Sequence, residues 1–172
     1  PRSDIELLKE YHEGLICLTS CVNVYISEPL IQNQDDEAVK RAEVLAKIFG
    51  EDSFYLELQK HVNVENQDIL NEKLIRLSQK LGVPLVATND NHYVFSTDAE
   101  AQEILLCIQT QTTLDTKNRK LSMISSPDFY MKSKEEMGGL FIQVPEALDN
   151  TGKIADMCNV EITLGKWIMP LF

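Results

Sequence analysis

Three short apolar runs, separated by two segments of helical length, constrain the fold of this chain more than any other feature. The runs cover residues 15–21, 53–59 and 83–88 and are compact or aromatic-rich. Such runs are typical of strands covered on both faces, as in a parallel sheet. Residues 35–49 and 66–81 carry apolar side chains at helical spacing. The order strand, helix, strand, helix, strand predicts an α/β fold with right-handed crossovers.

Further helices are expected before and after these segments. Residues 3–6 read as a capping box and predict a short first helix. Similar boxes at 97–100 and 133–136 predict two more helices, and Pro145 suits the first turn of a fourth. Asp35 is expected to cap the helix that it begins.

Three later segments have weaker patterns. Residues 110–126 are polar and predict a long surface loop, whereas 129–131 predict a short extended piece. The apolar tail, 164–172, contains a proline and is typical of a strand or a linker.

Composition limits the classes of function. The chain has 172 residues, is 44% hydrophobic and has a formal charge of -11, which is unfavourable for gripping a phosphate backbone directly. If nucleic acid is the substrate, we expect something outside this chain to hold it. No stretch approaches the roughly 20 apolar residues of a membrane span, and the first residues do not resemble a signal peptide. We therefore expect a cytoplasmic protein with no membrane partner and with its four cysteines reduced.

Polar residues follow each predicted strand. Cys21 ends the first strand, residues 59–61 end the second, and Asn89, Asp90 and His92 follow the third. The carboxyl ends of parallel strands share one rim of a sheet or barrel, so these side chains can converge there. Asp90 and His92 are two positions apart and would point to the same side of an extended segment.

Cys21, Asp90 and His92 together predict a transition-metal site. Thiolate and imidazole suit zinc, while added carboxylates allow manganese or iron. A metal there would lower the pKa of bound water towards about 7, so that hydroxide could attack a phosphoester.

Simpler interpretations remain open for each of these residues. Cys21 could be a small buried hydrophobe, Asp90 a turn cap and His92 an ordinary loop histidine. Glu57 lies in an apolar strand and needs a partner, so a structural role is favoured, and His61 is expected to be solvated rather than metal-bound.

Several stretches resemble the later part of the PHP (polymerase and histidinol phosphatase) domain of bacterial replicative DNA polymerase III alpha subunits. The resemblance runs nearly collinearly through the chain and is far more specific than an Asp-x-His pair alone. The matching stretches are residues 14–21, 54–61, 85–93, 105–110, 145–151, 158–161 and 164–166.

This resemblance implies a partial, distorted, seven-stranded β/α barrel with parallel strands, TIM-like in character, followed by a helical C-terminal segment. It assigns residues 1–110 to the C-terminal part of the barrel and 111–172 to a loop and helical extension leading towards the polymerase palm. The family's late metal ligands fall on Cys21, Asp90 and His92, with zinc or manganese as the metal. Its early ligands are absent, so only three of about nine are present.

The implied function is that of a fragment of a replicative DNA-directed DNA polymerase, with metal-dependent phosphoesterase or 3′–5′ exonuclease potential. The parent would be an enzyme that binds DNA and other polymerase III subunits, whereas the isolated fragment is expected to be inactive and to self-associate through exposed strand edge and apolar surface. One alternative is a structural module that braces the polymerase or docks a proofreading subunit without catalysis. Another is a free-standing PHP phosphoesterase.

Overall fold

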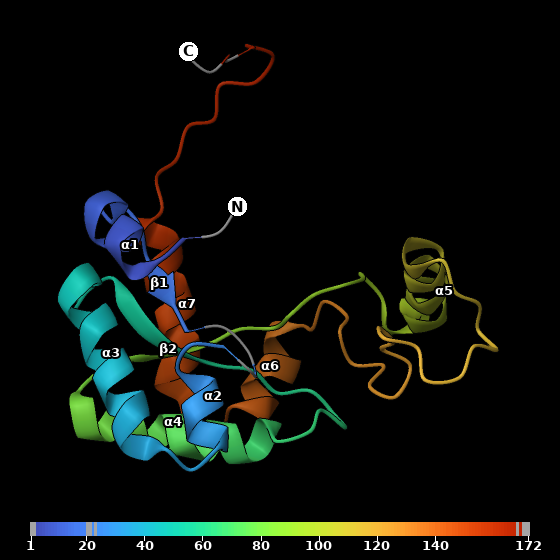
Figure 1. Ribbon diagram of the computed structural model, residues 1–172, viewed down its shortest axis with the longest axis horizontal. Coiled ribbons are helices and arrows are strands. Elements are labelled where there is room, and N and C mark those ends of the chain that lie inside the picture. The colour runs from blue at the N-terminus through green and yellow to red at the C-terminus, as the bar shows by residue number, and fades with distance from the viewer. Residues whose placement is uncertain (1–2, 20–21, 23, 168, 170–172) are drawn as a thin grey trace.

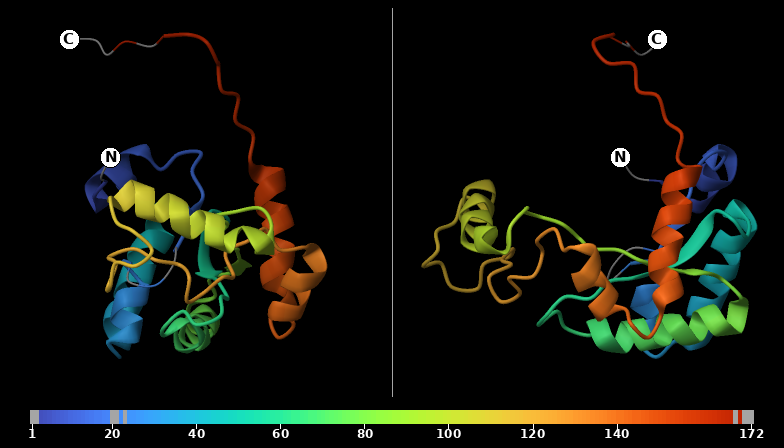
Figure 2. Two further views of the ribbon diagram at one scale, coloured as in Figure 1. Left: turned by 90° about the vertical axis from the view of Figure 1, so that its right-hand side faces the viewer. Right: turned by 180° about the vertical axis from the view of Figure 1, so that it is seen from behind.

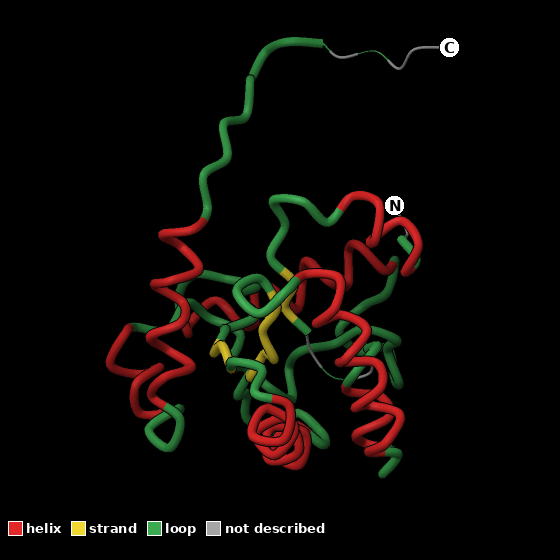
Figure 3. The backbone as a smooth tube through the Cα atoms, turned by 90° about the vertical axis from the view of Figure 1, so that its left-hand side faces the viewer, coloured by secondary structure: helices red, strands yellow, loops and turns green. Residues whose placement is uncertain are grey.

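A parallel three-stranded sheet lies at the centre of the molecule. The computed structural model describes residues 3–19, 22, 24–167 and 169. Within them the sheet order is β1 (Cys17–Leu18), β2 (Phe54–Leu58) and β3 (Leu85–Ala87), with every neighbouring pair parallel. The predicted α/β arrangement is therefore confirmed for these three strands. Figure 3 shows the strands surrounded by helices.

Two long crossover helices connect the strands, as predicted. They are α3 (Asp35–Phe49) between β1 and β2, and α4 (Gln67–Leu81) between β2 and β3. Gly50 and Gly82 follow them at positive φ of 78° and 71°, a conformation that favours glycine. The remaining helices are α1 (Ile5–Tyr11), α2 (Ser27–Ile31), the 3₁₀ turn η1 (Ser96–Asp98), α5 (Ala99–Thr110), α6 (Lys134–Leu140) and α7 (Pro145–Met157).

The main core lies between the sheet and helices α2, α3, α4 and α7. All five residues of β2 are buried, as expected for a strand covered on both faces. Phe54, Leu56 and Leu58 pack with Ala42 of α3 and Leu74 of α4 in one hydrophobic cluster. Ala147 of α7 belongs to the same cluster, and α7 packs along β3.

Three sequence predictions about helix starts need correction. The first helix is capped by Asp4, whose side chain accepts from the Leu7 amide, and no capping box is formed there. Asp35 is the first residue of α3 rather than its cap, and Gln34 precedes it without a capping bond. At 97–100 no capping box forms: Asp98 is the N-cap residue of α5 but makes no side-chain capping bond there, and its carboxylate instead accepts from the Phe95 amide at the start of η1.

Other predictions for the second half agree with the structure. Ser133 and Glu136 form the capping box expected at α6, and Pro145 occupies the first turn of α7. Residues 111–126 contain no helix or strand, and Tyr130 forms an isolated parallel bridge with Tyr93. The described part of the tail beyond Cys158 is likewise without regular structure.

Helix α5 and the following loop lie to one side of the sheet and its main helices (Figures 1 and 2). Glu103 fixes this unit internally: its carboxylate accepts from Arg119, from the Ser122 hydroxyl at 2.5 Å and from the Met123 amide at 2.8 Å. Among the described residues, no helix combines the length and hydrophobicity needed to cross a bilayer.

Candidate metal centre

A group of polar side chains lies along β2 and just beyond β3, near the carboxyl ends of the strands. The register pairs Glu57 of β2 with Val86 of β3. Beyond this pair, Thr88 donates its hydroxyl to Glu57 Oε1 at 2.5 Å, and Gln59 donates to the same oxygen at 3.3 Å. Glu57 thus has the partners that a buried carboxylate requires, which agrees with its expected structural role.

Asp90 and His92 come together just beyond β3, as their spacing predicts. His92 Nε2 lies 3.3 Å from Asp90 Oδ2, and the two side chains are 32% and 44% exposed. Both donor groups therefore face each other and remain accessible to solvent. An imidazole nitrogen and a carboxylate oxygen so placed suit two positions around a zinc or manganese ion.

The third predicted ligand, Cys21, lies outside the described residues. Across 3–19, 22, 24–167 and 169, no three His, Cys, Asp or Glu side chains are arranged to hold a metal ion. Cys17, on β1, has a pKa raised to about 11 by burial and by the charge of Glu57, so its thiol stays protonated at neutral pH. Within the part of the chain that the structure describes, Asp90 and His92 are the two predicted ligands that lie together.

His61 is buried, so the expectation that it is solvated is wrong. Its side chain is 2% exposed and stacks on Phe129, with ring centroids 4.3 Å apart. Burial, and then the charge of Lys132, lower its pKa, against the opposing effect of the Asp128 carbonyl and the Asp128 and Asp90 carboxylates. Nδ1 lies 3.4 Å from the Asp128 carbonyl, while the buried Nε2 has no hydrogen-bond partner among the described residues.

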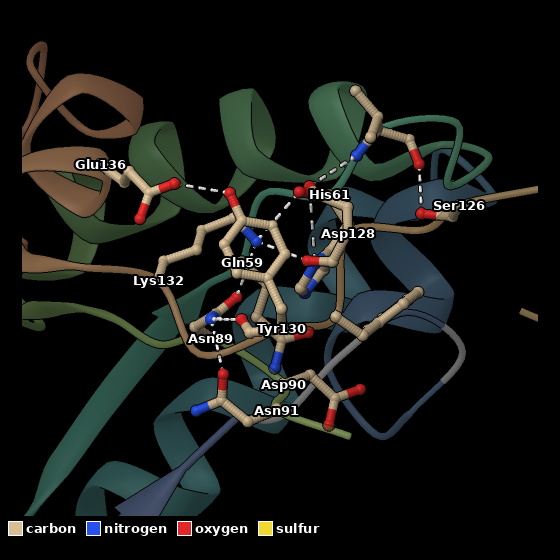
Figure 4. A network of polar contacts seen from close by, with 12 residues as sticks. Gln59, His61, Asn89, Asp90, Asn91, Ser126, Asp128, Tyr130, Lys132 and Glu136 are labelled. Carbon is tan, nitrogen blue, oxygen red and sulfur yellow. Dashed lines mark hydrogen bonds and ion pairs between the residues drawn. The ribbon is translucent and has the colours of Figure 1, made fainter. Parts of the chain in front are cut away.

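Asp128 and Lys132 join the ends of β2 and β3, and the sequence analysis missed both (Figure 4). The Asp128 carboxylate accepts from the Val62 amide at 3.1 Å and lies 3.1 Å from Lys132 Nζ. Lys132 is 3% exposed and also donates to Asn89 Oδ1 at 3.3 Å. The i, i+4 spacing of Asp128 and Lys132 was visible in the sequence, but nothing in it indicated that the Lys132 side chain would be buried, and that of Asp128 largely covered, beside the strand ends.

Tyr130 and Glu136 form a further pair on the same segment. The Tyr130 hydroxyl donates to Glu136 Oε1 at 2.6 Å, and this bond raises the pKa of the tyrosine to about 12. The same bond lowers the pKa of Glu136. Tyr130 is therefore a neutral hydrogen-bond donor rather than a base near neutral pH.

The family model and the relatives that match this chain point to the same family. Residues 1–61 match the model of the PHP domain. The chain is 45% identical over 171 residues to DNA polymerase III subunit alpha of Borreliella burgdorferi, covering 99% of this chain and 15% of the relative. The same subunit of Treponema pallidum is 40% identical, covering 100% of this chain and 14% of the relative. That of Deinococcus radiodurans is also 40% identical, with coverages of 96% and 12%.

The similarity extends over nearly all of this chain but over only a small part of each relative, so the chain corresponds to one segment of these subunits. The chain therefore belongs to the family of the DNA polymerase III alpha subunit and carries part of a PHP domain.

Proposed function

We propose that this chain supplies Cys21, Asp90 and His92 to a metal site in the PHP domain of a replicative DNA polymerase. The observation that carries the proposal is the 3.3 Å approach of Asp90 and His92 at the carboxyl rim of a parallel sheet. This rim is where α/β folds position their working residues. The remaining ligands would come from sequence outside this chain.

Zinc or manganese bound at this site would act as a Lewis acid towards a phosphoester and so support 3′–5′ exonuclease chemistry. His92 and Asp90 would each contribute one donor atom from a single loop. Because this chain holds only part of the ligand set, the isolated chain would be inactive.

The proposal also covers the domain that contains the site and the partners of the full-length protein. Residues 1–110 would form the C-terminal part of a seven-stranded barrel, and residues 111–172 would lead towards the polymerase palm. The full-length protein would act in the cytoplasm with DNA and other polymerase III subunits. Since this chain carries a formal charge of -11, the DNA would be held mainly by other parts of that protein.

One observation favours a second role, in which the segment braces the polymerase without catalysis. The strand ends are tied together by the nearly buried ion pair of Asp128 and Lys132, which links the chain after β2 to the chain after β3. Such an arrangement would maintain a rigid docking surface whether or not a bound metal catalyses a reaction.

The decisive experiment compares full-length proteins purified without chelator. Metal content by mass spectrometry and 3′ exonuclease activity are measured for wild type, for Asp90→Asn combined with His92→Ala, and for Asp115→Asn as a control in an exposed loop. Loss of both metal and nuclease only in the double variant supports the catalytic site. Metal loss with no nuclease in any protein would instead favour bracing, and absence of metal from the wild type would refute the ligand assignment.

A further inference from the structure

Phe129 lies between the two imidazoles at the rim of the sheet. Its ring stacks on His61 with centroids 4.3 Å apart and an interplanar angle of 22°. On His92 the contact is edge-on, with centroids 5.4 Å apart and an angle of 90°. One aromatic side chain therefore contacts a buried histidine and the predicted ligand histidine at the same time.

The backbone of the same residue also holds the ligand loop. The Phe129 carbonyl accepts from the His92 amide at 2.8 Å and from the Tyr93 amide at 3.3 Å. The Met131 amide donates a hydrogen bond to the Tyr93 carbonyl at 3.2 Å, next to the bridge between Tyr93 and Tyr130. Both the main chain and the ring of His92 are thus constrained by a segment 37 residues further along the chain.

The segment itself is anchored firmly on either side of Phe129. Before it, Asp128 accepts from the Val62 amide; after it, Lys132 donates to Asn89 and pairs with Asp128. Because Lys132 is 3% exposed, little water competes for these contacts. The stacked His61 is 2% exposed and supports one face of the Phe129 ring.

We propose that Phe129 is a positioning residue for the metal site, which fixes the ring plane of His92 so that Nε2 is aimed at the ion that it shares with Asp90. This inference rests on the proposed metal-binding function and adds to the site a residue of the segment between α5 and α6; Asp90, His92 and Phe129 all lie beyond the PHP match at residues 1–61. The lone pair with which an imidazole nitrogen binds a metal lies in the plane of the ring. A freely rotating His92 side chain would therefore lose orientational entropy when it binds the ion. An aromatic edge contact and a backbone hydrogen bond from one residue reduce that cost before the metal arrives.

The test uses the full-length protein and Zn²⁺ as the probe. Phe129→Leu removes the aromatic ring and keeps an apolar side chain, whereas Phe129→Tyr keeps the ring. Phe95→Leu makes the same exchange at a phenylalanine that is 66% exposed. Zinc affinity is measured by competition with a chelating dye, the visible spectrum of the Co²⁺-substituted site reports its ligand geometry, and thermal unfolding reports the fold.

The proposal predicts that Phe129→Leu weakens zinc binding about tenfold, as is typical when a group supporting a ligand is lost, and alters the cobalt spectrum. Phe129→Tyr and Phe95→Leu should both retain wild-type affinity and spectrum. If Phe129→Leu lowers the unfolding temperature markedly, Phe129→Met replaces it as the variant without a ring.

A wild-type affinity and spectrum in a ringless variant would overturn the positioning role, provided that His92→Ala loses zinc. Wild-type zinc affinity in His92→Ala would refute the ligand assignment itself, and the positioning role with it. Failure of the two proposals is thus distinguished by which variant retains the metal.

Discussion

Glu103 is a carboxylate that the chain keeps ionised although only 1% of its side chain is exposed. Burial alone would raise its pKa, but the hydrogen bonds from Ser122 and Met123 and the charge of Arg119 outweigh burial and lower it. Arg119, 10% exposed, also donates to the Leu114 carbonyl at 2.8 Å. One buried charge therefore organises the loop that follows α5.

This loop should be acid-labile. The folded pKa of Glu103 lies below its ordinary value of 4.5, so its stabilisation is complete above that value and is lost as the pH falls through the folded pKa. We predict that exchange of the Met123 amide, which Glu103 protects, accelerates as the pH falls below about 4.5, beyond the intrinsic pH dependence of exchange.

Glu103→Gln should remove this acid transition and destabilise the loop by about 3 kcal/mol at neutral pH, because Arg119 loses its buried partner. Glu100→Gln, at an exposed position of the same helix, is the control. An unchanged Met123 exchange rate in Glu103→Gln would contradict this account.

The spacing of Asp90 and His92 was enough to predict their approach, because extended residues two apart point to the same side. The burial of His61 was not predictable, since Phe129 covers it from a segment with little pattern of its own. The same holds for Lys132, whose partners Asp128 and Asn89 come from different parts of the chain. Contacts made across the fold carry no local sequence signal.

At the level of elements, β3 has one edge paired with β2 and the other covered partly by α7. Asn150 of α7, 6% exposed, donates its amide to the Leu85 carbonyl at 2.7 Å. This bond replaces the ladder hydrogen bond that a further strand would supply at that carbonyl. It also fixes α7 against the sheet.

Asn150→Ala should therefore destabilise the protein by about 1–3 kcal/mol, because the Leu85 carbonyl would be left buried without a donor. Urea unfolding at neutral pH measures the difference, with Asn159→Ala in the exposed segment after α7 as the control. Equal stabilities of the two variants would show that the bond does not hold the helix.

Elements with strong periodicity were predictable, and short ones were not. Both crossover helices follow from apolar spacing and a terminal glycine, and their observed bounds differ little from the prediction. Helix α2 was missed because it has five residues and contains Pro29. It forms because Leu30, within the helix, and Ile26, just before it, are buried against α3 and α4. Packing against distant parts of the chain, rather than local sequence, therefore stabilises this helix.

At the level of the whole molecule, α5 lies beside the main body (Figure 2). Leu105 and Ile108 are 59% and 69% exposed, and the neighbouring Phe95 is 66% exposed. Apolar surface of this kind on an ordered helix favours association. The tail is also apolar, with Leu164 86% exposed, but its described part carries no regular element that could present a fixed face.

The isolated chain should self-associate through the α5 surface. Sedimentation velocity should show species heavier than the 19.6 kDa monomer, and Ile108→Lys should reduce their amount. Leu164→Lys, an equal change in the tail, should leave them unchanged. A monomer at all concentrations, or equal effects of the two substitutions, would refute association through α5.

The central claim is that Asp90 and His92 are metal ligands, and anomalous X-ray scattering tests it most directly. Crystals of the full-length protein grown with Zn²⁺ would be measured on either side of the zinc absorption edge. The account predicts an anomalous peak about 2 Å from His92 Nε2, at a similar distance from an Asp90 oxygen, and within bonding distance of the Cys21 sulfur. Zinc bound elsewhere, with the 3.3 Å contact between His92 and Asp90 unchanged, would contradict it.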